Sequence, residues 1–287
     1  QNEQEADRIG ILNLEKAGYD PRSMPTMFER LGRQYRYDAK PPEFLLTHPV
    51  TESRIADTRN RAEQAPQGGI EDSLRYQLIR ARVQLIYEET PGLGAKRFRA
   101  LLDENPKNDI ARYGLAIAQI KGGQLNEARE NLKLLLAKSP NEIIYNLAQI
   151  DLDTTNNRLA DAQSRVDRML TQYPGNYPLN QVRVDLLLKQ NRAADAEKAL
   201  EGLLKSRPDD PDVWYQVAET RGLSGNIIGL HQARAEYFAL VGDYRQAIQQ
   251  LDFAKRKAGS NFPLSSRIDA RQRELMDQER MIKDMMG

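Results

Sequence analysis

The sequence predicts an all-α protein, built mainly as a solenoid of helix-turn-helix repeats. Proline recurs at a constant interval of 34 residues, at Pro106, Pro140, Pro174 and Pro208. Alanine recurs at the same interval, at Ala128, Ala162 and Ala196. A strict period of this length indicates short helical units that form a continuous core by stacking on one another.

The period of 34 residues is that of the tetratricopeptide repeat. In the unit 109–140 a first helix is followed by a Gly122-Gly123 turn and a second helix that carries Ala128, Leu132 and Leu135. The alanine lets paired helices approach closely, and leucines three and four residues apart form the buried stripe. Proline then ends the second helix and starts the next unit.

The alanine signature changes its spacing near the C-terminus. Ala247 follows Ala196 by 51 residues, which is one and a half periods and predicts an inserted half repeat. The inserted helix is expected over residues 212–223, where Trp214 should pack in the core, and the last full pair over 230–241 and 243–258. We therefore predict a repeat domain over 67–260 and a C-terminal capping helix over 261–287.

Residues 1–66 lack the period and are predicted to form a separate domain piece. Helices are expected to residue 17, over 23–35 and over 51–64, with a turn at 18–21 and an irregular loop through Pro41-Pro42. The composition of residues 65–69 is that of a linker. A piece this short and rich in turns would form a meagre core, so we expect it to be the end of a domain that begins upstream.

Composition excludes several functional classes. The chain has 42 Lys and Arg against 41 Asp and Glu, and this net charge of +1 gives no general attraction to nucleic acid. It has no cysteine and two histidines, which excludes thiol nucleophiles and thiolate metal sites. The longest apolar run is far too short for a transmembrane segment. Protein partners are therefore favoured.

Three motifs in the first 66 residues occur in the order of a known family. Glu3 and Asp7 share one helical face, although such a pair alone usually marks a solvated surface. Ala-Gly-Tyr-Asp-Pro follows at 17–21, then Phe-Leu-Leu-Thr-His-Pro at 44–49 and Arg54-Ile55. Together these resemble the C-terminal part of the HtpX and CAAX-prenyl-protease-like zinc metallopeptidases.

The resemblance implies a Zn²⁺ site and roles for three residues. In the family, two histidines of an HExxH helix and a later glutamate bind zinc, so Glu3 would be the third ligand and Asp7 the associated catalytic acid. His48 has two open interpretations, a structural histidine or an additional, regulatory zinc ligand that holds the protease off. No HExxH occurs in these 287 residues. This segment alone is therefore predicted to be inactive, with the missing helix expected before Gln1.

The inner face of the repeats is expected to bind a protein. Its predicted partner-binding positions lie on three successive first helices: Tyr113, Ile117, Leu147, Asp151, Gln181 and Asp185. The basic residues of a clamp for C-terminal carboxylates are absent from these positions. A mixed apolar and acidic groove suits an extended or partly folded protein segment, and a charge at Tyr113 is expected to weaken binding without unfolding the repeats.

The combination of both parts narrows the resemblance to periplasmic members of the family that carry C-terminal repeats. It implies a zinc endopeptidase and chaperone for the assembly and quality control of outer-membrane β-barrel proteins. Implied partners are substrates such as LptD and the BamA assembly machinery. The alternative is a non-catalytic adaptor or chaperone that retains a degenerate peptidase remnant.

Overall fold

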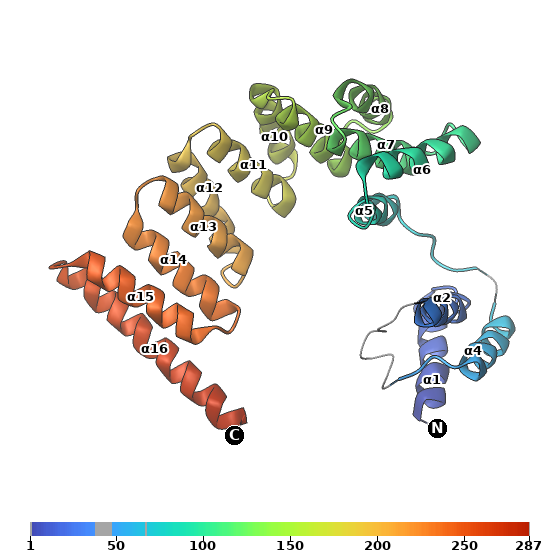
Figure 1. The fold of residues 1–287 in the computed structure, drawn as a ribbon, viewed down its shortest axis with the longest axis horizontal. Coiled ribbons are helices and arrows are strands. Elements are labelled where there is room, and N and C mark those ends of the chain that lie inside the picture. Colours follow the sequence, from blue (N-terminus) through green and yellow to red (C-terminus); the bar gives the residue numbers. More distant parts are fainter. Residues whose placement is uncertain (1, 38–47, 67, 287) are drawn as a thin grey trace. The chain divides into compact units, whose positions relative to one another are not determined.

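The computed structural model describes residues 2–37, 48–66 and 68–286. In these ranges every regular element is a helix, which confirms the predicted all-α class. The chain divides into two compact units, Gln1–Tyr76 and Gln77–Gly287 (Figure 1). The predicted domain boundaries stay predictions. The Phe-Leu-Leu-Thr part of the family motif, at 44–47, and the predicted loop around Pro41-Pro42 lie outside the described residues.

The first unit contains α1 (Asn2–Lys16), α2 (Ser23–Tyr37) and α4 (Glu52–Gln64). Helix α4 packs against both α1 and α2. Its start is fixed by Thr51, whose side chain accepts a hydrogen bond from the backbone N–H of Arg54. The small core is formed by apolar side chains from all three helices: Ile11, Phe28, Ile55 and Ala62.

The turn after α1 holds the segment that the sequence predicts to be a linker. Gly18 has a φ of +79°, and its carbonyl oxygen accepts a hydrogen bond of 2.8 Å from the backbone N–H of Ile70. A Cβ on Gly69 would lie only 2.4 Å from a backbone nitrogen of this turn. Arg22 also donates to the carbonyl oxygen of Ala65 at 2.9 Å. Ala65, Gly69 and Ile70 are therefore held against the turn after α1 rather than free of it.

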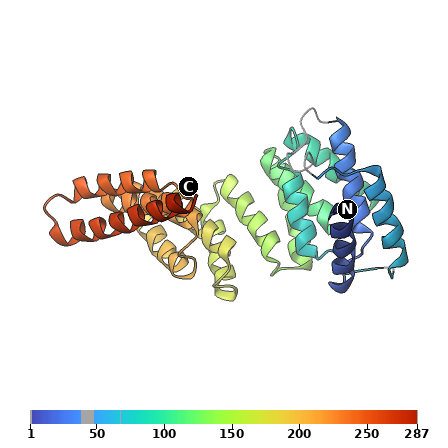
Figure 2. The ribbon, with the colours of Figure 1, turned by 90° about the horizontal axis from the view of Figure 1, so that it is seen from below.

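The second unit is an array of antiparallel helices, and from its second helix onward consecutive helices pack against each other. They are α5 (Leu74–Gln84), which begins just before the division, α6 (Pro91–Glu104), α7 (Asp109–Lys121), α8 (Leu125–Lys138), α9 (Ile143–Thr155), α10 (Leu159–Gln172), α11 (Tyr177–Lys189), α12 (Ala193–Ser206), α13 (Pro211–Leu223), α14 (Ile227–Leu240), α15 (Tyr244–Ala258) and α16 (Phe262–Met286). Figure 2 shows the last two, in orange and red, running antiparallel and side by side.

The predicted half-repeat insertion stays a prediction. Helices α7, α9, α11 and α13 begin at 34-residue intervals, and so do α8, α10, α12 and α14. An inserted half repeat adds a single helix and therefore leaves this spacing unchanged. The predicted inserted helix is α13, and the predicted last pair corresponds to α14 and α15, which pack against each other. Ala247 belongs to α15, and Gly229, Ala233 and Ala235 are buried in α14.

A hydrogen bond recurs in four successive repeats although its donor changes in chemical type. One side chain of each first helix donates to the carbonyl oxygen of the proline six residues earlier: Arg112 to Pro106 at 2.7 Å, Asn146 to Pro140 at 2.9 Å, Asn180 to Pro174 at 2.9 Å and Trp214 to Pro208 at 2.7 Å. Trp214 packs against the core and also makes this bond. These bonds satisfy a backbone carbonyl at each junction between repeats.

Candidate functional site

The first candidate site lies between α1 and α4, where Arg54 joins the two predicted acidic residues. Nε and Nη2 of Arg54 donate to the two carboxylate oxygens of Asp7, both at 2.7 Å. Nη1 of Arg54 lies 2.9 Å from Oε2 of Glu3 and donates to the carbonyl oxygen of Pro49 at 3.1 Å. The guanidinium also lies over the ring of Phe28, 5.0 Å from its centroid.

Asp7 holds Arg54 in place in this structure, and its predicted catalytic role stays a prediction. The residue is 3% exposed, and both carboxylate oxygens accept hydrogen bonds from Arg54. The bidentate geometry fixes the guanidinium plane, which in turn fixes Glu3. The hydrogen bonds to Asp7 raise the pKa of Arg54, so its charge is permanent.

The two predicted metal ligands, Glu3 and His48, face each other. Nδ1 of His48 lies 2.5 Å from Oε1 of Glu3, and both side chains are exposed to solvent. This hydrogen bond, together with the nearby charge of Arg54, lowers the pKa of the Glu3 carboxyl. A carboxylate oxygen and an imidazole nitrogen are both ordinary zinc ligands. The donor chemistry of Glu3 and His48 therefore fits a zinc ion. Arg54 contacts the other carboxylate oxygen of Glu3 and helps to orient it.

These two side chains alone do not complete a metal site. Within the described ranges, no group of three or more His, Cys, Asp or Glu residues is arranged to hold a metal ion. A hydrolytic zinc centre usually has three protein ligands and one open position. Further ligands would have to come from outside the described part of this chain.

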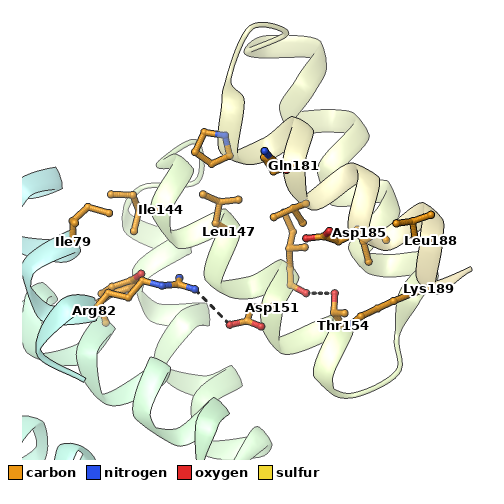
Figure 3. Close-up of a pocket in the computed structure, with 15 residues that line it drawn as sticks. Ile79, Arg82, Ile144, Leu147, Asp151, Thr154, Gln181, Asp185, Leu188 and Lys189 are labelled. Carbon is orange, nitrogen blue, oxygen red and sulfur yellow. Dashed lines mark hydrogen bonds and ion pairs between the residues drawn. The ribbon is translucent and has the colours of Figure 1, made fainter. Parts of the chain in front are cut away.

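The second candidate site is a groove on the inner face of the repeats. A cavity of about 610 Å³ is lined by residues of α5, α7, α9 and α11. Figure 3 shows Ile144, Leu147 and Asp151 of α9 on one wall, with Gln181 and Asp185 of α11 on the other. A second hollow of about 600 Å³ extends toward α13 and shares three residues with the first, Gln181, Asp185 and Leu188. We call the two hollows together the inner groove.

The structure brings five of the six predicted partner-binding residues to this groove. Ile117 is the exception, because it is 1% exposed and packs in the core. Tyr113 lines the groove but is fully buried, with its ring centroid 6.0 Å from that of Tyr145. Burial raises the pKa of the Tyr113 hydroxyl, although Arg82 partly opposes this. The burial of Tyr113 argues against the expectation that a charge there leaves the repeats folded.

Sequence reasoning missed the residues that complete the groove. Arg82 of α5 lies 4.0 Å from Asp151, the ion pair drawn in Figure 3, and Lys189 follows Asp185 by one helical turn. Ile144 and Val182 add apolar surface. Arg82 belongs to the repeat whose sequence matches the period least well. Ile144, Val182 and Lys189 could have been found by following the inward-facing positions further along α9 and α11.

No helix in the described part of the chain is both long enough and apolar enough to cross a membrane.

The two parts of the chain match two known families. Residues 1–62 match peptidase family M48, and residues 85–150 and 154–219 match the tetratricopeptide repeat. Over 290 residues the chain is 34% identical to the beta-barrel assembly-enhancing protease of Escherichia coli (strain K12), covering 99% of this chain and 58% of that protein. The chain thus spans little more than half the length of this relative.

Two further likenesses are more limited. A stretch of 50 residues is 50% identical to the mitochondrial metalloendopeptidase OMA1 of Arabidopsis thaliana, covering 17% of this chain and 10% of that protein. The crystal structure of PilW, a type IV pilus biogenesis factor, has a TM-score of 0.49 at 18% identity and covers 75% of this chain and 100% of PilW. The chain therefore joins a segment of peptidase family M48 to tetratricopeptide repeats and is a homologue of the β-barrel assembly-enhancing proteases.

Proposed function

We propose that this chain is the C-terminal part of a periplasmic zinc metalloendopeptidase that also acts as a chaperone for outer-membrane β-barrel proteins. The observation that carries the proposal is the contact between Glu3 and His48. Arg54 also contacts Glu3, and all three residues lie in the segment that matches peptidase family M48. The similarity over 99% of the chain to a protein named for β-barrel assembly supports the biological role. The tetratricopeptide repeats support a function in protein binding.

In this proposal Glu3 is a zinc ligand, and Arg54 and Asp7 hold its carboxylate in place. Zinc, when bound, would polarise the scissile carbonyl and lower the pKa of a water molecule. The chain's own contribution is orientation: Asp7 fixes Arg54, and Arg54 restricts Glu3 to one rotamer. The proposal requires an HExxH helix that these 287 residues do not contain. The segment alone is accordingly expected to be inactive.

His48 is proposed as an additional ligand that restrains the peptidase. Its Nδ1 lies 2.5 Å from Oε1 of Glu3, the proposed zinc ligand. Replacing His48 with Ala in a protein that includes the HExxH helix should raise the rate of proteolysis. An unchanged or lower rate would contradict the regulatory role and favour a structural one.

The repeats are proposed to bind the protein partners. Substrates such as LptD and the BamA assembly machinery are the partners that the family resemblance implies. The inner groove is the surface of this chain that fits such a role, because it combines apolar walls with acidic side chains.

The test is the zinc content of the protein extended upstream to include the HExxH helix. We expect about one zinc per chain, lost in Glu3→Gln and absent from the 287-residue segment. Glu5→Gln is the matched control, because Glu5 lies on the same helix and its ion pair among the described residues is with the exposed Arg8. Lack of zinc in the extended protein would instead favour the alternative, a non-catalytic adaptor with a degenerate peptidase remnant.

A further inference from the structure

The inner groove contains a carboxylate that has no partner. Asp185 lies where the two hollows meet, and it makes no hydrogen bond or ion pair in the part of the chain that the structure describes. Its counterparts one repeat before and one repeat after are both paired. Asp151 lies 4.0 Å from Arg82, and Glu219 lies 3.5 Å from Arg234. Among Asp151, Asp185 and Glu219, Asp185 is therefore the one that makes no ion pair with a described residue.

The surroundings of Asp185 make this unpaired charge costly. Side chains of Leu147, Ile150, Val182 and Leu188 form the nearby apolar walls of the groove. Burial among them raises the pKa of the Asp185 carboxyl, and the charge of Lys189 only partly offsets this effect. An ionised carboxylate in such a place gains stability from a cation that brings its own hydrogen-bond donors.

Other unpaired groups in the groove also require donors. The side-chain oxygens of Gln181 and Gln216 are buried and accept no hydrogen bond from the described residues. The buried hydroxyl of Tyr113 is likewise without a hydrogen-bond partner there. Amide oxygens are acceptors, and the backbone N–H groups of an extended peptide are the donors best suited to them. An acidic or anionic ligand would add acceptors and meet repulsion from Asp185.

From these contacts we infer that the inner groove binds an extended polypeptide segment in which a basic side chain, flanked by apolar residues, pairs with Asp185. The apolar neighbours occupy the walls formed by α9 and α11, and the backbone N–H groups reach the free oxygens of Gln181 and Gln216. This inference rests on the proposed role of the repeats in binding protein partners and specifies the chemistry of the segment they accept. Figure 3 shows the two walls and the position of Asp185 between them.

The test compares two fluorescein-labelled peptides by fluorescence anisotropy with the 287-residue chain. One peptide is Gly-Ser-Leu-Phe-Arg-Val-Ser-Gly, and in the other citrulline replaces arginine, which removes the charge but keeps the shape. The chain should bind the arginine peptide about tenfold more tightly than the citrulline peptide. Asp185→Asn should abolish this preference, whereas Asp103→Asn, a change at an exposed carboxylate of α6, should preserve it.

Three results would overturn the inference: equal affinity of the unaltered chain for both peptides, an arginine preference that survives Asp185→Asn, or no binding of either peptide. The comparison of the two peptides on the unaltered chain does not depend on how well any variant folds. Because the assay contains no peptidase step, its outcome is independent of whether the proposed zinc site binds metal. Failure of the groove inference and failure of the proposed peptidase function are therefore distinguishable.

Discussion

Replacing Arg54 with Gln should loosen the packing of α1 against α4. The substitution removes two hydrogen bonds of 2.7 Å to Asp7, the contact of 2.9 Å with Glu3 and the bond to the carbonyl of Pro49. It also removes the cation–π contact with Phe28. Asp7 then remains as a buried carboxylate, 3% exposed, without its partner.

The expected loss of stability follows from this burial. Removing one partner of a buried ion pair costs about 3–5 kcal/mol, and we take about 3 kcal/mol because the Arg54 side chain keeps some access to solvent. A unit the size of Gln1–Tyr76 has a total stability of about 4–11 kcal/mol at 0.05–0.15 kcal/mol per residue. The substitution should therefore remove a large fraction of the stability of the first unit.

Hydrogen exchange followed by mass spectrometry measures this effect locally. A loss of about 3 kcal/mol corresponds to roughly hundredfold faster exchange of protected amides in α1 and α4. Helix α9 of the second unit serves as the internal reference. Arg61→Gln is the matched control on the same helix, because its pair with Asp57 is largely exposed and contributes less than about 1 kcal/mol. Equal acceleration of exchange in both variants would refute the role assigned to Arg54.

Three further predictions concern the repeats. Asn146→Ala should lower the stability of the second unit by about 2–3 kcal/mol, because the buried groups bonded to Asn146 lose their partner. Urea unfolding followed by circular dichroism measures this loss. The control Asn126→Ala, at an exposed position, should change the stability by less than about 0.5 kcal/mol. Tyr113→Lys should reduce helicity, since it places a charge against Tyr145; a fully helical variant with an unchanged melting temperature would contradict the burial argument. Burial raises the pKa of Asp185, so below about pH 4 its protonated carboxyl leaves the stability of the folded state intact. Part of this stability is lost as the pH rises through the raised pKa of the folded state. Asp185→Asn should accordingly raise the melting temperature at about pH 7 but not at about pH 3, and equal shifts at both pH values would count against it.

Much of the fold could be predicted because the repeat makes local signals agree with one another. Helix α2 begins at the predicted Ser23, α7 begins at Asp109, and α16 (Phe262–Met286) lies within the range predicted for the capping helix, 261–287. The alanines that carry the period are fully buried, as their role in close helix packing requires. The predicted half repeat stays a prediction, because the spacing of the helices does not decide which of them form a pair.

The candidate peptidase site could be predicted only in part. The spacing of Glu3 and Asp7 shows that they share a helical face, but it does not show which of the two side chains is buried. Arg54 lies in α4, and nothing local in its sequence indicates that it joins Glu3, Asp7 and Pro49. The role of such a residue depends on contacts between segments about 50 residues apart in the chain.

The sequence by itself determined the helical class, the repeat period, the likeness to a metallopeptidase family and five of the six residues predicted to line the inner groove. Only the tertiary structure decided that Asp7 holds Arg54, that Ile117 and Tyr113 are buried, and that Asp185 remains unpaired in the groove. The physical reason is that helical periodicity fixes which side chains lie on one face. Which neighbour covers that face, and which charge it brings, depends on how the helices pack.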